Sequence, residues 1–117
     1  MKTSEAGKRV DLYGASYRNF ASELYSEIRR EAFGEDIGQT GWVTAEEQDL
    51  FISWLHLARS SQLLDLACGS GKPTLRIAQK IGCHVSGVDL HADAVASAKS
   101  SARELGYEGR TKFYQGN

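Results

Sequence analysis

The apolar side chains near the start of the chain recur with the period of a helix. Five of them lie four, three, four and four positions apart, namely Tyr13, Tyr17, Phe20, Leu24 and Ile28. This spacing places them on one face and predicts an amphipathic helix over residues 12–33. Tyr13 and Tyr17 are candidates for lining a substrate pocket. An aromatic pair at helical spacing is more often part of a core, which is the interpretation we favour.

A second helix is predicted after a break in the pattern. Three glycines between Gly34 and Gly41 interrupt the periodicity, and Thr44 then begins the sequence Thr-Ala-Glu-Glu, a capping box in which Glu47 reaches back to the cap amide. We therefore expect a helix from near Ala45 that ends at Ser60–Ser61. Its apolar positions again have helical spacing: Leu50, Phe51, Trp54, Leu55 and Ala58.

From Gln62 onward, short apolar runs alternate with helical patterns. The run Gln62–Ala67 is bounded by turn signals and is typical of a strand buried on both faces of a parallel sheet. Further strands are expected at Cys83–Asp89 and Thr111–Gln115. The predicted connecting helices run from Pro73 to Ile81, closed by Gly82, and through Val95, Ala98, Ala102 and Leu105, capped by Gly106. This order predicts an α/β fold with a parallel sheet and right-handed crossovers.

Composition narrows the class of partner. The 117 residues include 14 Lys plus Arg and 15 Asp plus Glu without a basic stripe, which argues against nucleic acid and a membrane surface and favours a small-molecule ligand. The polar first eight residues do not resemble a signal peptide, so we expect a cytoplasmic protein. Cys68 and Cys83 are expected to be reduced thiols. The three histidines lack metal-ligand spacing, and we expect no metal.

The candidate chemistry lies between the first strand and the helix after it. Leu63–Thr74 reads LLDLACGSGKPT, and Gly69 and Gly71 allow a sharp turn with close approach of a ligand. A structural requirement for glycine in such a connection is the competing explanation. A phosphate-binding P-loop is excluded because Leu66 replaces its first glycine and Pro73 its hydroxyl residue. A dinucleotide fingerprint is weakened, though not eliminated, because Thr74 replaces its third glycine.

Two acids accompany this loop. Asp89 ends the second predicted strand, where its carboxylate can accept hydrogen bonds from both hydroxyls of a ribose. The alternative is that Asp89 caps the helix beginning near His91. An acid at this position suits both adenosylmethionine and NAD sites. Asp65, four residues before Gly69, is the feature that separates the two.

The segment LLDLACGSGKPTLRIAQKIGCHVSGVDLHADAVASAKSSARELG resembles the first two motifs of the class I S-adenosylmethionine-dependent methyltransferases, and FYQGN at Phe113–Asn117 resembles the next one. The resemblance implies a three-layer Rossmann-like fold and S-adenosyl-L-methionine as cofactor. Asp36–Leu55 is similar to the helical segment of members that methylate small molecules. Residues 1–60 would then form an amino-terminal helical lid, and residues 61–117 the first half of the cofactor-binding domain.

The resemblance also assigns site residues. The acid matching Asp65 lies near the cofactor's amino group, the loop backbone wraps the methionine portion, Asp89 holds the ribose and Leu90 packs on adenine. Asn117 stands where an acid commonly approaches the adenine amino group. Ala67 replaces a common glycine, at little cost if its backbone dihedrals are those of a strand. The implied cofactor-binding residues are Asp65, Ala67, Cys68, Gly69, Ser70, Gly71, Asp89, Leu90 and Asn117.

The family's remaining strands and its acceptor-binding loops do not follow in this sequence. We therefore expect a truncated, catalytically incomplete portion of a methyltransferase, with the alternatives of an NAD(P)-binding oxidoreductase fragment or a non-catalytic module. No catalytic base can be assigned. With three strands in the family's order, Gln62–Ala67 would be an edge strand. We expect that edge to be covered by homodimerisation, strand exchange or an amino-terminal helix.

Overall fold

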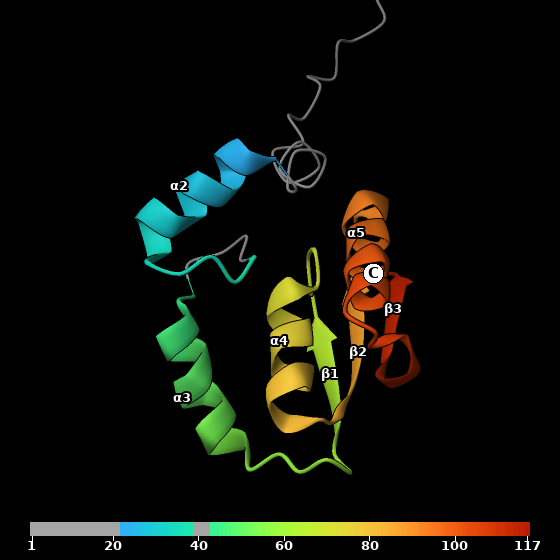
Figure 1. Cartoon of the computed structure of the whole chain (residues 1–117). Helices are drawn as coiled ribbons and strands as arrows, with labels where there is room; N and C mark the ends of the chain where they lie inside the picture. The colour runs from blue at the N-terminus through green and yellow to red at the C-terminus, as the bar shows by residue number, and fades with distance from the viewer. Residues whose placement is uncertain (1–21, 39–42) are drawn as a thin grey trace, which may run out of the picture.

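The computed structural model describes residues 22–38 and 43–117, which form a small parallel sheet flanked by helices (Figure 1). The strands are β1 (Gln62–Leu66), β2 (His84–Asp89) and β3 (Thr111–Gln115). The helices are α2 (Glu23–Phe33), α3 (Ala45–Leu55), α4 (Lys72–Ile81) and α5 (Ala92–Glu104), with a short 3-10 helix at Glu108–Arg110. None of these helices is long and apolar enough to cross a membrane.

The three strands are parallel and adjacent in chain order, β1-β2-β3, as the sequence predicts. Val85 is aligned with Leu63 of β1 on one side and with Thr111 of β3 on the other. Helices α4 and α5 contact each other and pack on the same face of the sheet. The core lies between them and the strands, and its buried members include Leu75, Ala78, Cys83, Val85, Val95, Ala98 and Phe113. The crossovers thus place both helix amino termini at the carboxyl ends of the strands.

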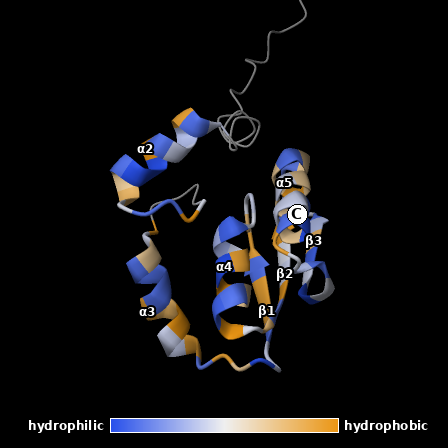
Figure 2. Cartoon of the chain, viewed as in Figure 1, coloured by the Kyte–Doolittle hydropathy of each residue, from blue (hydrophilic) through white to orange (hydrophobic). Residues whose placement is uncertain are grey.

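The opposite face of the sheet is open in the described part of the chain. Leu64 is 59% exposed and Leu66 is 70% exposed, so the expectation of a strand buried on both faces is wrong. The strand also ends at Leu66, one residue before the predicted boundary. The physical reason is that α4 and α5 cover only one face, and alternate residues of β1 point away from them. Figure 2 shows β1 as a largely hydrophobic strand beside this uncovered side.

The edge position of β1 agrees with the prediction, but helices α2 and α3 do not bury its outward side chains. An amino-terminal helix from the described residues is therefore not the cover that we expected. Homodimerisation and strand exchange remain predictions.

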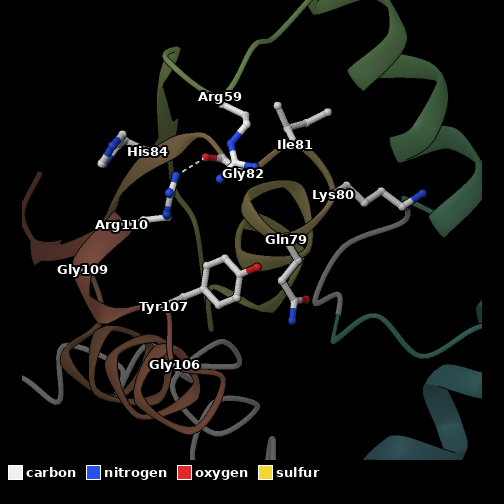
Figure 3. Close-up of a pocket in the computed structure, with 10 residues that line it drawn as sticks. All are labelled: Arg59, Gln79, Lys80, Ile81, Gly82, His84, Gly106, Tyr107, Gly109 and Arg110. Carbon is white, nitrogen blue, oxygen red and sulfur yellow. Dashed lines mark hydrogen bonds between the residues drawn. The ribbon is translucent and has the colours of Figure 1, made fainter.

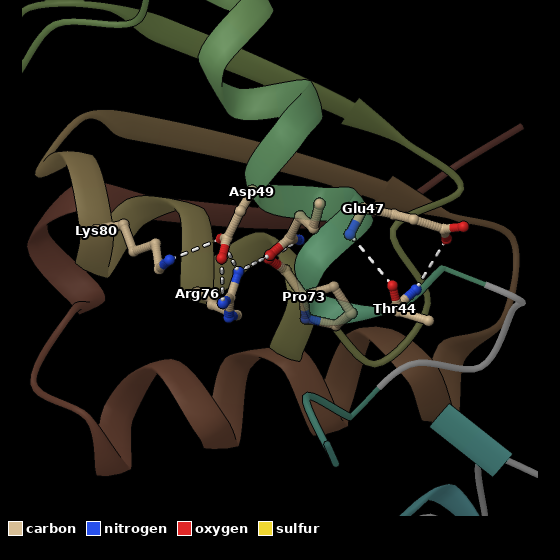
Figure 4. Close-up of polar contacts among 7 residues, drawn as sticks. Thr44, Glu47, Asp49, Pro73, Arg76 and Lys80 are labelled. Atoms are coloured by element: carbon tan, nitrogen blue, oxygen red, sulfur yellow. Dashed lines mark hydrogen bonds and ion pairs between the residues drawn. The ribbon is translucent and has the colours of Figure 1, made fainter. Parts of the chain in front are cut away.

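Helix α3 begins as predicted and ends early. Thr44 Oγ1 accepts a hydrogen bond from the Glu47 amide at 3.1 Å, and Glu47 Oε2 accepts one from the Thr44 amide at 3.1 Å, which confirms the capping box (Figure 4). His56 adopts a left-handed conformation and caps the helix after Leu55, so Ala58 lies outside it. The predicted extension to Ser60–Ser61 is therefore wrong.

The contacts of α3 with α4 include a set of charged and amide groups (Figure 4). The Gln48 side-chain amide donates to the Pro73 carbonyl at 2.8 Å, and Arg76 donates to both Gln48 and Asp49. Lys80 donates to Asp49 at 2.6 Å. The predicted apolar set is largely exposed instead, with Trp54 at 63%. The periodicity of the apolar residues predicted the helix correctly, but it did not predict which face of α3 packs against α4.

Helix α2 covers only the end of the first predicted helix. Ser22 is extended and its hydroxyl accepts from the Tyr25 amide, so a helix begins at Glu23 rather than running continuously from residue 12. Tyr13, Tyr17 and Phe20 lie outside the described residues. Arg29 is buried in this helix, whereas Ile28 is half exposed. A buried polar contact, described below, therefore decides the orientation of α2.

Candidate functional site

The glycine loop connects β1 to α4 at the carboxyl edge of the sheet, where α/β proteins bind their ligands. Three of its residues have left-handed dihedrals: Ala67, Gly69 and Gly71, with φ of 59°, 59° and 77°. The Gly71 amide donates to the Cys68 carbonyl at 3.1 Å, and the Cys68 amide donates to the Val88 carbonyl of β2 at 3.1 Å. The loop is thus a tight turn fixed to the neighbouring strand.

Ala67 does not have the backbone dihedrals of a strand, in which its side chain would cause no strain. Its φ of 59° lies in the left-handed region, which costs an L-residue about 1–2 kcal/mol. The expectation of a mild departure from glycine is therefore corrected. The turn keeps the left-handed conformation that a glycine would adopt without strain. The hydrogen bonds of the Cys68 and Gly71 amides hold the turn, and with it Ala67, in that conformation.

Gly71 has a packing role in addition to its conformation. A side-chain carbon at this position would lie 2.6 Å from the Cβ of Ala98 and 3.1 Å from the ring of Phe113. The backbone at the cap of α4 therefore lies too close to Ala98 of α5 for a side chain at this position. The close packing explains why a glycine is required at position 71, and a role in admitting a ligand is not needed to explain it.

Asp89 joins the glycine loop to the start of α5. Its side chain is 6% exposed, Oδ2 accepts from the Gly69 amide at 2.8 Å, and Oδ1 accepts from the His91 amide at 2.9 Å. Asp89 is not the cap residue of α5, because that position is occupied by His91 and no side-chain hydrogen bond caps the helix. The ribose role remains a prediction, and the two carboxylate oxygens offer about four acceptor positions, of which the two amides use two.

Asp65 is the second acid of the site. It accepts a hydrogen bond from the Thr74 hydroxyl at 2.5 Å. Burial raises the pKa of Asp65, the Thr74 hydrogen bond opposes this effect, and repulsion from Asp89 adds to it. Two carboxyl groups therefore lie within electrostatic reach of each other beside the glycine turn. Sequence reasoning considered Thr74 only as a missing glycine and did not identify it as the partner of Asp65.

The side chains of Cys68 and Ser70 point into the protein. Burial, together with Asp65 and Asp89, raises the pKa of the Cys68 thiol to about 12, so this cysteine is a neutral, unreactive group at physiological pH. Ser70 is 1% exposed, and its hydroxyl donates to the Gly38 carbonyl at 3.3 Å. Any contact that these two residues make with a ligand would come from their backbone.

Leu90 and Asn117 lie near Asp89 at the ends of neighbouring strands. The Gly116 amide donates to the Asp89 carbonyl at 3.0 Å, and the Gln115 side chain donates to the Leu90 carbonyl at 3.2 Å. The Leu90 side chain is 61% exposed, as a platform for an aromatic ring would be. Asn117 follows directly and is also exposed. The fold therefore brings the predicted site residues to one edge.

A cavity of about 700 Å³ at the opposite end of the sheet is a different feature (Figure 3). Arg110 donates to the Gly82 carbonyl at 2.5 Å, and the Arg59 side chain lies over Gly82. These cations complement the negative carboxyl end of α4. Despite its volume, we assign it no ligand, because the glycine turn and both acids lie at the other edge. The described residues also contain no group of three or more metal-ligating side chains.

The arrangement is of the Rossmann-like class. The chain shows this class through its parallel sheet, its glycine turn at a helix start and the acid at the end of the second strand. A family model described as a methyltransferase domain matches residues 57–117. The chain belongs to the class I S-adenosylmethionine-dependent methyltransferase family.

Known proteins of several kinds resemble the chain. Sterol 24-C-methyltransferase ERG6B of Gibberella zeae is 27% identical over 94% of this chain and 31% of its own length. The 23S rRNA (uracil(747)-C(5))-methyltransferase RlmC of Halothiobacillus neapolitanus is 41% identical over 46% of this chain and 14% of its own length. A methyltransferase of Geobacter sulfurreducens, solved with S-adenosyl-L-homocysteine, is 32% identical with a TM-score of 0.58 over 62% of this chain and 30% of its own. The chain thus spans less than half the length of these relatives.

The strained turn predicts a stabilising substitution. Ala67→Gly should relieve the left-handed strain, and the greater entropy of glycine in the unfolded chain offsets part of the gain, so we expect a rise of up to about 1 kcal/mol in the free energy of unfolding. Urea denaturation measures this change. The matched control Ala96→Gly, on the exposed face of α5, should instead lower stability by about 1 kcal/mol. A loss of stability in Ala67→Gly would contradict the account of this turn.

The raised pKa of Asp65 predicts a pH-dependent effect. The folded state binds the Asp65 proton more tightly than the unfolded state does, so this group lowers stability as the pH rises from the unfolded pKa through the folded one. Asp65→Asn keeps an acceptor for Thr74 and removes the charge. The variant should be more stable than the wild type at pH 7, and the difference should vanish near pH 3. Thermal unfolding across this range is the measurement, with the exposed Asp93→Asn as control. A pH-independent difference would contradict the assignment.

Proposed function

We propose that the protein binds S-adenosyl-L-methionine at the glycine loop and transfers its methyl group to a small-molecule acceptor. The observation that carries this proposal is the pair of acids on the two sides of the turn, the partly buried Asp65 and the buried Asp89. Asp65 would face the positively charged amino group of the methionine portion, and Asp89 the ribose. The backbone of residues 67–71 would wrap the methionine portion between them, and Leu90 and Asn117 would contact adenine.

The charge of the site also weighs against the competing dinucleotide. Asp65 is a partly buried carboxyl whose ionised form is disfavoured, and a cationic ligand beside it would restore a favourable interaction. The pyrophosphate of NAD carries the opposite charge and would meet two carboxylates beside the loop. The structure therefore supports a zwitterionic, sulfonium-bearing nucleoside better than a dinucleotide.

Methyl transfer from a sulfonium requires mainly that the protein position the acceptor and the cofactor. The bond between sulfur and the methyl carbon breaks as the bond from the acceptor to that carbon forms, and the electron pair remains on sulfur. Aligning the acceptor behind the methyl group and excluding water supply much of the rate. A base is needed only for acceptors that must lose a proton, and we assign none.

A second cavity supports an uncharged acceptor. A space of about 280 Å³ adjoins the glycine loop, with a wall formed by α3, α4 and the end of β1. Its lining by described residues is mainly apolar, including Val43, Phe51, Ile52, Leu55 and Ile77, with Asp65 as the acid among them. No lysine or arginine is among these described lining residues, so they offer nothing to a phosphate backbone. We therefore favour an apolar metabolite over RNA as acceptor.

The cofactor assignment is tested at Asp89. Asp89→Ala should weaken S-adenosylhomocysteine binding by about a hundredfold, since it removes two charge-assisted hydrogen bonds worth about 3 kcal/mol in total. Titration calorimetry measures the affinity, and Asp93→Asn in the exposed first turn of α5 is the matched control. NAD should bind far more weakly than S-adenosylhomocysteine to the wild type. Equal affinities for the two nucleotides, or an unchanged affinity in Asp89→Ala, would refute the assignment.

The acceptor class is tested by filling the apolar cavity. In a protein that carries the whole methyltransferase domain, we expect methyl transfer from labelled S-adenosylmethionine to a naphthoquinol or an aromatic amine and none to an unmodified ribosomal RNA transcript. Ile52→Trp should raise the KM for the acceptor by tenfold or more, since its larger side chain occupies about the volume of one ring, while the affinity for S-adenosylhomocysteine stays unchanged. Transfer to the RNA, or an unaltered acceptor KM in this variant, would contradict the proposal.

A further inference from the structure

The described residues that follow α2 lie against the glycine loop. We call Asp36–Gly38 the strap. In Figure 1 it leaves the end of α2 and reaches the amino-terminal end of α4. The Gly38 carbonyl accepts from the Ser70 hydroxyl at 3.3 Å, and a Cβ on Gly38 would stand 2.5 Å from the Cβ of Lys72. The backbone of the strap is therefore in direct contact with the glycine loop and the start of α4.

The middle residue of the strap contributes to the cavity beside the site. Ile37 is 8% exposed and lines the 280 Å³ space together with Ala67 and Cys68 of the loop. The strap thus contacts the loop through the Gly38 carbonyl, and its Ile37 side chain lines the same cavity as the loop. The position of the strap therefore determines the shape of this part of the cavity wall.

A buried ion pair holds the strap in this position. Arg29 Nε of α2 lies 2.6 Å from Asp36 Oδ1, and the two side chains are 8% and 16% exposed. The Ser26 hydroxyl donates to Asp36 Oδ2 at 2.6 Å, and the Gly38 amide donates to Oδ1 at 2.9 Å. One carboxylate therefore joins α2 to both ends of the strap. We refer to Arg29 and Asp36 as the clamp.

The clamp remains charged throughout the physiological range. Burial alone would raise the pKa of Asp36, but hydrogen bonds from Arg29, Ser26 and the Gly38 amide outweigh it and lower the pKa to about 2. Removing Arg29 takes away two hydrogen bonds and the ion pair of the Asp36 carboxylate, and removing the Asp36 charge takes away the contact that joins α2 to the strap, which is more costly than losing an exposed pair. Single substitutions should therefore release the strap.

We propose that Arg29 and Asp36 are positioning residues for the cofactor: they fix the strap, and the strap fixes Ser70 and the turn that receives the ligand. This inference rests on the proposed cofactor site, although neither clamp residue needs to touch the ligand. The clamp would act by keeping the loop in its binding conformation before the ligand arrives, which lowers the ordering cost of association.

The first test needs no cofactor. Hydrogen exchange at the amides of Gly69–Lys72 should be faster in Asp36→Asn and in Arg29→Met than in the wild type. Glu108→Gln is the matched control. It breaks the exposed ion pair between Arg103 and Glu108, whose N–O distance is 2.9 Å and which does not involve the loop. Unchanged exchange in both clamp variants would overturn the proposal.

The second test measures S-adenosylhomocysteine binding, at a temperature where circular dichroism shows each variant to be folded. Either clamp substitution should weaken the affinity by roughly tenfold, mainly through faster dissociation, and the double variant should be no weaker than the singles because the pair acts as one unit. Gly38→Ala leaves the clamp intact and should weaken binding similarly, since its methyl group would meet Lys72. Glu108→Gln should bind as the wild type does.

The outcomes separate the two proposals. A purely structural clamp would lower the melting temperature of Asp36→Asn and leave its affinity for S-adenosylhomocysteine at the wild-type value, which would overturn the positioning role alone. Failure of the wild type to bind S-adenosylhomocysteine would overturn the proposed function, and the positioning role with it.

Discussion

The Asp89 carboxylate is the contact on which the arrangement of the site depends. It is almost fully buried, and a buried charge is tolerated only where hydrogen bonds replace its lost hydration. The Gly69 and His91 amides provide them, one from the loop after β1 and one from the start of α5. A single carboxylate therefore sets the distance between the two helix starts that face a ligand. Without it, the hydrogen bond from the Cys68 amide to the Val88 carbonyl would still join the turn to β2, but no side chain would join it to the start of α5.

The strands and the central helices could be predicted because their signals are local. Gly82 and Gly106 mark the ends of helices, Pro73 lies in a first turn, and the Thr44 capping box is formed as expected. The acids of the site were also found from the sequence, because their position at strand ends fixes which edge they occupy. Thr74 was missed as a partner of Asp65 because no local pattern distinguishes a hydroxyl that donates to a carboxyl from one that does not.

The failures concern properties that depend on distant contacts. Periodicity alone could not show that α3 approaches α4 through Gln48 and Asp49 while Trp54 stays exposed. The start of α2 at Glu23 depends on the Ser22 cap, and its orientation on a buried arginine that pairs beyond the end of the helix. The left-handed Ala67 is a similar case, since an alanine carries no signal for φ above zero. In each case, tertiary structure overrides the local preference.

The one-sided sheet has a consequence for how the chain folds. The three strands pair in the order in which they are made, and each crossover helix packs directly beside the strands it joins. Each parallel pairing nevertheless spans a whole helix, since Gln62 of β1 aligns with His84 of β2, and pairings of this kind form more slowly than local helical contacts. The apolar side chains of Leu64 and Leu66 face water on the outer side of the sheet once it has formed. An exposed apolar face next to an unpaired strand edge favours association with other chains during folding.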